Sequence, residues 1–334
     1  PTEGPMILFD YGCAKHLSRG YDLIAETRTA TSHTYFTNGG RQGEQITRWA
    51  REIADLVASH GGGNKRLAVD KLDPLATHAL EREGIVVTDG EELMEFARAI
   101  KNADEIVAMK EAIAACEAGI EKMWRELKPG MTENEVWAHL HATNIALGGE
   151  WIECRLLTSG ERTNPWFQEC SGRVIQPGDI VGFDTDLIGP NGYCADISRT
   201  WVAGDARPTN EQHRLYQTAL DNLHHNLDLV KAGLSFREFT EKSYRLAPEF
   251  VDRRYSCIMH GVGLCDEYPF ATYREDFERW GFDGQFEAGM TVCVEALIGV
   301  VGGKECVKLE QQVLVTETGY ELLSKSPLGL RPNY

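Results

Sequence analysis

Acidic side chains and one histidine recur among apolar and small residues in five segments of this 334-residue sequence. Burying a carboxylate between valines is costly unless the group is paired or bound to a metal. Several carboxylates that converge would also repel one another, and a pair of divalent cations resolves that repulsion. The candidate metal ligands, in chain order, are Asp184, Asp186, Asp196, His260, Glu295 and Glu310.

Each of these groups also has a plainer interpretation. A glutamate in a strand, such as Glu295 or Glu310, usually faces solvent. Asp184 and Asp186 precede the turn sequence Gly189–Gly192 and could themselves be turn residues. The histidine could be a core residue with a satisfied ring. The order and spacing of the whole series, rather than any one member, favour a metal site.

The strands and helices that must hold these groups follow from the spacing of apolar residues. Residues 1–98 alternate short strand and helix signals and predict a small α/β domain. Apolar residues three and four apart predict a long amphipathic helix over 103–127. The chain then becomes strand-rich, with further helices expected over 210–229 and 235–249. We therefore expect two domains, 1–98 and 99–334, with every candidate ligand in the second.

Composition limits the classes of function. The formal net charge is −17, so the chain repels phosphate backbones at long range, and a nucleic-acid partner is not expected. No apolar run approaches the roughly 20 residues of a membrane helix, and no signal peptide opens the sequence. Nine cysteines without a CxxC pair predict free thiols in a reducing compartment. We therefore expect a cytoplasmic protein without a membrane partner.

The order Asp, Asp, His-Gly-x-Gly, Glu, Glu resembles the metal-ligand series of the pita-bread metallopeptidases, the superfamily of methionine aminopeptidase, prolidase and creatinase. The flanking sequences match as well. Residues 192–200 (GYCADISRT) resemble the strand with their second aspartate, and residues 287–295 (EAGMTVCVE) resemble the approach to their first glutamate. The resemblance covers about residues 100–325. It implies an α+β pita-bread catalytic domain that follows a smaller, creatinase-like N-terminal α/β domain.

The sequence departs from the peptidase pattern at the substrate-handling positions. The peptidases space their two metal aspartates by eleven positions, whereas two aspartates here precede Asp196 by twelve and ten. An additional carboxylate is therefore available to a metal. Two histidines of the peptidases are also replaced, one by Trp166 and one by Asp266. Their loss argues against peptide hydrolysis but not against metal binding.

Aromatic residues near these positions could hold a cation. With these departures and aromatic residues, the sequence resembles one non-peptidase branch of the superfamily, DddP, the dimethylsulfoniopropionate (DMSP) lyases. That resemblance implies that all six candidate ligands bind a pair of metal ions, usually described as iron. The oxygen-rich ligand set also suits manganese, cobalt or zinc. The resemblance further implies Asp266 as general base, Tyr255 and Trp166 as substrate contacts, and a homodimer. The implied reaction is β-elimination of DMSP to dimethyl sulfide and acrylate, for which the base needs a raised pKa.

Three other functions fit the same sequence less well. A metallopeptidase that cleaves X-Pro bonds shares the metal site but lacks the two histidines. A creatinase-like carbon–nitrogen hydrolase keeps the fold without metal, whereas this sequence retains the whole ligand set. A catalytically inactive pita-bread domain that binds proteins usually loses ligands, and none is lost here. Metal analysis separates the last two functions from the first, and product analysis separates a lyase from a peptidase.

Overall fold

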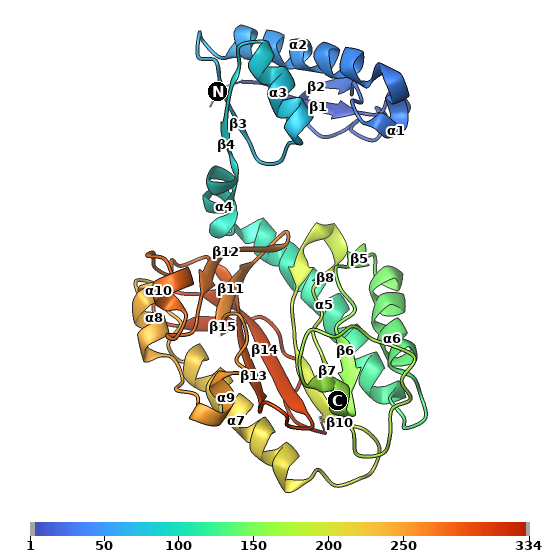
Figure 1. Cartoon of the computed structure of the whole chain (residues 1–334), viewed down its shortest axis with the longest axis vertical. Helices are drawn as coiled ribbons and strands as arrows, with labels where there is room; N and C mark the ends of the chain where they lie inside the picture. Colours follow the sequence, from blue (N-terminus) through green and yellow to red (C-terminus); the bar gives the residue numbers. More distant parts are fainter. Residues whose placement is uncertain (1–3, 332–334) are drawn as a thin grey trace. The chain divides into compact units, whose positions relative to one another are not determined.

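The computed structural model describes residues 4–331 of the chain. It forms two compact units, Pro1–Met94 and Glu95–Tyr334 (Figure 1). The division falls inside helix α4 (Glu91–Ala99), a few residues before the expected boundary at 98 and 99. All six candidate ligands lie in the C-terminal unit.

The N-terminal unit contains two pairs of parallel strands, β1–β2 and β3–β4, with helices α2 and α3. Its core joins the two helices and is small: Ile46, Ala50, Ala76, Ala79, Leu80 and Ile85 are buried. The elements are β1 (Met6–Asp10), β2 (Ile24–Thr29), α1 (Tyr35–Asn38), the 3-10 turn η1 (Gly39–Arg41), α2 (Gln42–His60), β3 (Arg66–Val69), α3 (Pro74–Arg82) and β4 (Val86–Asp89). This unit is the small α/β domain that the sequence predicts.

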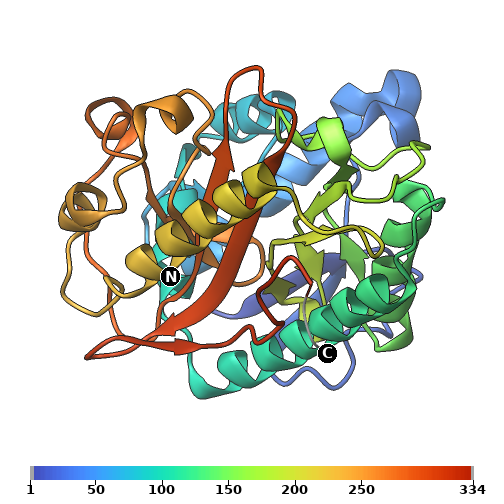
Figure 2. The same ribbon diagram turned by 90° about the horizontal axis from the view of Figure 1, so that it is seen from below.

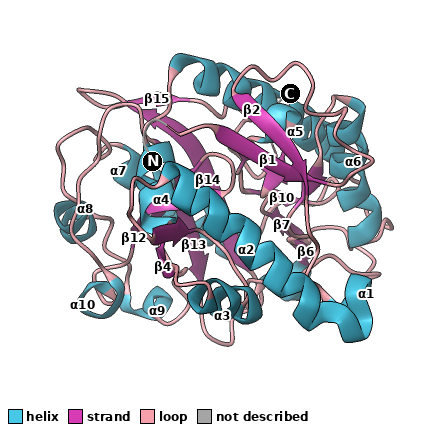
Figure 3. Ribbon diagram, turned by 90° about the horizontal axis from the view of Figure 1, so that it is seen from above, coloured by secondary structure: helices cyan, strands magenta, loops and turns pink. Residues whose placement is uncertain are grey.

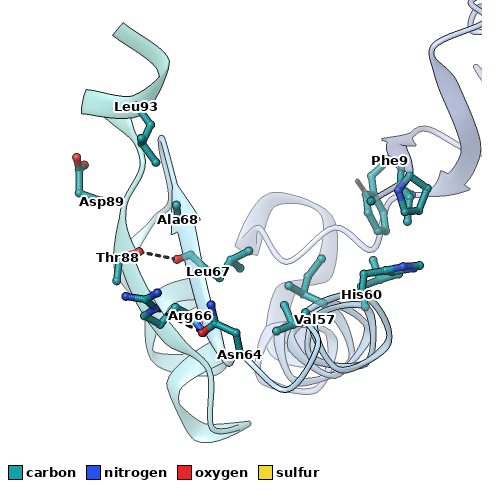
Figure 4. Close-up of a pocket in the computed structure, with 16 residues that line it drawn as sticks. Phe9, Val57, His60, Asn64, Arg66, Leu67, Ala68, Thr88, Asp89 and Leu93 are labelled. Carbon is teal, nitrogen blue, oxygen red and sulfur yellow. Dashed lines mark hydrogen bonds between the residues drawn. The ribbon is translucent and has the colours of Figure 1, made fainter. Parts of the chain in front are cut away.

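A cavity of about 820 Å³ lies within the N-terminal unit (Figure 4). Phe9 of β1, Val57 and His60 of α2, and Leu67 of β3 line it. Most of its lining is apolar, and Asp89 is the one acidic residue among the described lining residues. The described residues that line this cavity therefore offer no set of carboxylates that could hold a metal.

The C-terminal unit begins within α4 and contains the strand-rich part of the chain. Its helices are α5 (Ala103–Glu126), α6 (Glu133–Ala146), α7 (Asn210–Leu227), α8 (Phe236–Lys242), α9 (Pro248–Val251) and α10 (Phe277–Trp280), with 3-10 turns η2 (Gly160–Thr163) and η3 (Pro190–Gly192). Its strands are β5 (Trp151–Ile152), β6 (Leu157–Ser159), β7 (Ile180–Phe183), β8 (Leu187–Ile188), β9 (Cys194–Ala195), β10 (Arg199–Val202), β11 (Met259–Val262), β12 (Asp266–Ala271), β13 (Thr291–Gly299), β14 (Cys306–Val315) and β15 (Tyr320–Leu322).

Three antiparallel sheets form the interior of this unit. The largest has the order β12-β11-β13-β14-β15, and the smaller ones have the orders β10-β7-β6 and β5-β8-β9. Strands β13 and β14 lie side by side in the largest sheet (Figure 3). With nine and ten residues, they are the longest strands in the described part of the chain. Helix α7 crosses these two strands, and α5 packs against α6 (Figure 2). The sheets are thus held between two helical layers.

Local sequence signals explain where the helices of this unit begin. Asn102 and Thr132 accept hydrogen bonds from backbone N–H groups of the first turns of α5 and α6, and a glutamate three residues later completes each capping box. The helix expected over 235–249 is wrong in part, because α8 ends at Lys242 and α9 begins only at Pro248. A residue before proline avoids the helical conformation, and Ala247 is extended.

None of the helices described between residues 4 and 331 is long and apolar enough to cross a membrane.

Candidate metal centre

Two strands of the large sheet bring a pair of glutamates together. Glu295 of β13 and Glu310 of β14 are directly opposite residues in the antiparallel register, so their side chains share one face. Both side chains are about 1 % exposed or less. His260 of β11 pairs with Cys293 of β13, two residues from Glu295. The register of three neighbouring strands therefore gathers the histidine and both glutamates, as the ligand series requires.

The three aspartates come from the ends of shorter strands. Asp184 and Asp186 follow β7, and Asp196 follows β9. Between the first two, the Thr185 hydroxyl donates to the Ala195 carbonyl oxygen and accepts from the Ile197 N–H, each at 2.9 Å. Asp186 has a φ of 35°, in the left-handed region that costs energy for a residue other than glycine. The backbone thus holds these carboxylates in place at some conformational cost.

The ligand atoms of these residues surround a common space. His260 Nε2 lies 3.4 Å from Glu310 Oε1, 3.5 Å from Asp196 Oδ2 and 3.7 Å from Glu295 Oε1. These separations exceed the roughly 2.7–2.9 Å of a charge-assisted hydrogen bond. Glu310 Oε1 is buried, and no hydrogen-bond donor of the described residues satisfies it. An orphaned carboxylate oxygen beside an imidazole nitrogen and further carboxylates fits a divalent cation.

Electrostatics in the metal-free chain show how strongly these carboxylates interact. Burial, opposed by Lys308 and reinforced by Glu310, raises the pKa of Asp184 to about 7. Burial and then the charge of Asp184 raise the pKa of Asp186 to about 7. Burial and the neighbouring Glu310 raise the pKa of Asp196 well above its ordinary value. Protons are therefore favoured on these three aspartates when no metal ion neutralises them.

A cavity of about 420 Å³ opens onto this cluster. Its lining combines carboxylates, the histidine and four aromatic rings. The lining residues are Glu95, Asp184, Asp186, Asp196, Tyr255, Ser256, Cys257, His260, Asp266, Glu267, Tyr268, Phe270, Phe282 and Glu295. The cavity therefore gives a small molecule access to the cluster of candidate ligands.

Asp266 stands at the edge of this cluster, as the first residue of β12. Its Oδ1 lies 3.6 Å from His260 Nδ1, and its carboxylate is grouped with those of Asp186 and Asp196 within 4.8 Å. The side chain is 50 % exposed, whereas Asp186 is half-buried and Asp196 is buried, so burial does not enclose the Asp266 carboxylate. Asp266 can meet both the solvent and a molecule in the cavity.

The aromatic residues expected at the site separate into two groups. Tyr255 lines the cavity, whereas Trp166 is not among the lining residues. Trp166 is 9 % exposed and forms a small buried cluster with Leu297 and Cys306. Tyr255 packs against this cluster. The cavity instead receives the rings of Tyr268, Phe270 and Phe282. Trp166 therefore lies in the layer behind Tyr255.

Several residues of the site were absent from the sequence-based set. Lys308 places its ammonium 2.6 Å from Glu295 Oε2 and 2.8 Å from Asp184 Oδ2. The Ser198 hydroxyl lies 2.6 Å from Asp184 Oδ1. Lys308 precedes Glu310 by two positions in β14 and therefore shares its face of the strand, a signal that period-two counting could have found.

Two thiols also contact the cluster. Cys154 Sγ lies 2.7 Å from Asp186 Oδ2, and Cys257 Sγ lies 2.8 Å from Glu295 Oε1. The sequence contains no local pattern that assigns either cysteine to a carboxylate. Each thiol satisfies one carboxylate oxygen and helps to fix its orientation.

Known proteins are similar to this chain in sequence and in fold. The model of metallopeptidase family M24 matches residues 107–317. Two dimethylsulfoniopropionate lyases named DddP, from Roseovarius nubinhibens and Roseobacter denitrificans, are 47 % and 42 % identical to the chain over 98 % of its length. The chain belongs to the DddP branch of metallopeptidase family M24. It spans 74 % of the length of each of these DddP relatives.

Solved structures of M24 proteins confirm the expected pita-bread fold. An Xaa-Pro dipeptidase from Bacillus anthracis superposes with a TM-score of 0.80 at 26 % identity, over 97 % of this chain and 85 % of that one. The match covers both units of the chain. Membership of the DddP branch and the fold shared with dipeptidases agree with the resemblance that the sequence alone showed.

Proposed function

We propose that the chain is a DMSP lyase, which converts DMSP to dimethyl sulfide and acrylate by metal-dependent β-elimination. The observation that carries the proposal is the accessible Asp266 carboxylate beside a buried acidic cluster, in a chain 47 % identical to a DddP lyase. A small cavity that joins one free carboxylate to a cation site suits proton abstraction next to a carboxylate group.

The cluster would hold a pair of divalent ions, with iron as the proposed metal and manganese, cobalt or zinc as chemically suitable substitutes. The ligand residues would be Asp184, Asp186, Asp196, His260, Glu295 and Glu310. Bound cations would supply positive charge to the substrate carboxylate, which stabilises the enolate-like charge that develops when the α proton leaves. The orphaned Glu310 Oε1 supports a cation at this position.

Asp266 would act as the general base. It would take the proton from the carbon α to the substrate carboxylate, and the electron pair of that C–H bond would form the carbon–carbon double bond. The bond from the β carbon to sulfur breaks, and sulfur keeps its electron pair, so neutral dimethyl sulfide leaves without an acid catalyst. Half of the Asp266 side chain is open to solvent, which lets the proton leave after each cycle.

The cationic sulfonium end of DMSP would lie against aromatic rings, since sulfonium and ring faces attract each other. Tyr255 remains a proposed contact because it lines the cavity. Phe270 is a further candidate, because it faces His260 directly across the β11–β12 pair. Trp166 packs with Tyr255 and would support that ring from behind.

An X-Pro metallopeptidase is the second candidate, favoured by the similarity to the Xaa-Pro dipeptidase of Bacillus anthracis. Against it stand Trp166 and Asp266 at the places of two substrate-handling histidines. Trp166 lies in the layer behind the cavity, and its indole offers only an N–H donor, whereas a histidine could also accept a proton. A lyase needs neither histidine.

Headspace gas chromatography tests the proposal. Iron-reconstituted protein should release dimethyl sulfide from DMSP, and chelation should abolish the release. Asp266→Asn should lose activity by a factor of at least about 100, on the scale of a lost general base, while it binds as much metal as the parent. Asp283→Asn, a change of an exposed aspartate outside the cavity lining, is the matched control. Full activity in metal-loaded Asp266→Asn refutes the assigned base, and cleavage of X-Pro dipeptides without dimethyl sulfide refutes the lyase.

We also propose that the enzyme is a cytoplasmic homodimer. All nine cysteines are free thiols, six of them buried, which suits a reducing compartment. The dimer is proposed by analogy with the DddP branch. Light scattering coupled to gel filtration would test it, and a monomeric mass at micromolar concentration would reject it.

A further inference from the structure

Lys308 is a charged side chain inside the ligand cluster that the proposed reaction does not use. It is fully buried and is the third residue of β14. Its ammonium lies 2.8 Å from Asp184 Oδ2, 2.6 Å from Glu295 Oε2 and 3.5 Å from Glu310 Oε2. Those three carboxylates are also one of the groups whose oxygens approach one another closely enough to hold a metal. A protein cation therefore already contacts one side of the cluster.

The contacts of Lys308 leave it no free donor. An ammonium has three N–H groups, and Asp184, Glu295 and the Ser198 hydroxyl at 2.9 Å account for three acceptors. The ring of Tyr255 covers the same ammonium at 4.5 Å from its centroid. Lys308 is thus poorly placed to bind a substrate carboxylate or to accept a proton. Its effect on the site must come from charge and from the orientation of its partners.

The charge of the site follows from counting its members. The five carboxylates of the candidate ligands, counted without the half-exposed Asp266, against one ammonium and a neutral histidine leave a formal charge of −4. Two divalent cations balance that charge. Without Lys308 the same ligands would carry −5 and would attract cations more strongly while repelling an anionic substrate group.

We propose that Lys308 is a positioning residue of the metal centre, a built-in cation that fixes Asp184 and Glu295 and limits the affinity of the site for divalent metal. This inference rests on the proposed metal-dependent function and deepens it. Lys308 keeps the metal-free cluster folded, because it neutralises buried carboxylates that would otherwise repel. It also lets the loaded site become neutral, so the loaded site does not repel a substrate carboxylate.

Metal titration of purified, chelator-treated protein at pH 8 tests the role of Lys308, with Mn²⁺ as the probe and calorimetry as the readout. Lys308→Met should bind Mn²⁺ at least about tenfold more tightly than the parent, since it removes a repelling charge. Its metal-free form should unfold at a lower temperature than the metal-free parent. Lys308→Gln keeps two hydrogen-bond donors without the charge and should also bind more tightly. It provides the comparison if the methionine variant does not fold without metal.

The matched control is Lys101→Met, which removes another buried lysine that pairs with Glu267 instead of the cluster. Lys101→Met should leave the affinity for Mn²⁺ within about threefold of the parent. Unchanged or weaker Mn²⁺ binding by both neutral variants of Lys308 overturns the inference, and the DMSP lyase proposal then stands if the parent is active. A folded parent that binds no divalent metal overturns the metal centre itself and this inference with it.

Discussion

Glu133 provides a direct test of how the scaffold of the site is held together. It lies in the first turn of α6 and is fully buried. Its two oxygens accept hydrogen bonds from the backbone N–H and the hydroxyl of Ser159, at 2.8 Å each, and from those of Ser171, at 3.0 and 2.7 Å. Arg162 pairs with the same carboxylate. Ser159 ends β6, the strand that pairs with β7 before Asp184.

Glu133→Gln keeps the size of the side chain but removes its charge and one acceptor. The new NH₂ group would face N–H and O–H donors, so buried donors would lose partners at about 1–3 kcal/mol each. Breaking a buried ion pair costs about 3–5 kcal/mol, and Arg162, with 26 % of its side chain exposed, recovers some hydration. We therefore expect a loss of about 3–5 kcal/mol in the free energy of unfolding, or about 6–20 °C in Tm.

Urea and thermal unfolding of the metal-loaded enzyme, followed by circular dichroism, measure this loss. Glu135→Gln is the matched control, because the same change two residues later affects an exposed capping-box carboxylate bound to Thr132. Glutamine also serves in a capping box, so the control should cost less than about 1 kcal/mol. Equal losses for the two variants would show that the buried network does not stabilise the fold as argued.

Two further predictions concern the cavity and the cluster. In chelated protein, Asp184 and Asp186 have a pKa of about 7, so the native state binds protons that the unfolded state releases between about pH 4 and 7. The stability of the chelated protein should therefore fall as pH rises through that window. Thermal unfolding that shows the same Tm across the window would contradict this prediction. Added metal should remove the dependence of Tm on pH. Phe270→Leu should raise KM for DMSP by about two- to fivefold with kcat nearly unchanged, because one cation–π contact contributes about 0.5–1 kcal/mol. Phe270→Tyr should retain the parent KM, and a loss confined to kcat would reject the contact.

The sequence by itself determined the fold family and the main helices. Apolar residues three and four apart predicted the helix over 103–127, and α5 spans Ala103–Glu126 because Asn102 caps it. Local signals of this kind need no tertiary contact. The helix expected over 235–249 was wrong in part, since a strong apolar pattern does not show that the chain before Pro248 is extended.

The sequence also supplied the order of the candidate ligands, because each carboxylate stands in a recognisable strand or turn. What it could not supply is which side chains meet. Glu295 and Glu310 face each other only because β13 and β14 pair in one register. Packing of the sheet that contains β7 against the sheet that contains β14 brings Lys308 to Asp184, which lies 124 positions away. Such a contact leaves no trace in local sequence.

The environment of each group was likewise decided by the tertiary structure. Trp166 and Tyr255 are both aromatic residues close to the site, yet packing leaves only Tyr255 in the lining of the cavity. Asp266 is half exposed, whereas the neighbouring Glu267 is buried. Residue type and spacing determine what chemistry is available, whereas burial and the direction of side chains depend on how distant strands pack. The sequence therefore supplied the candidate ligands of this protein, and the packed sheets decided their charge balance and their access to solvent.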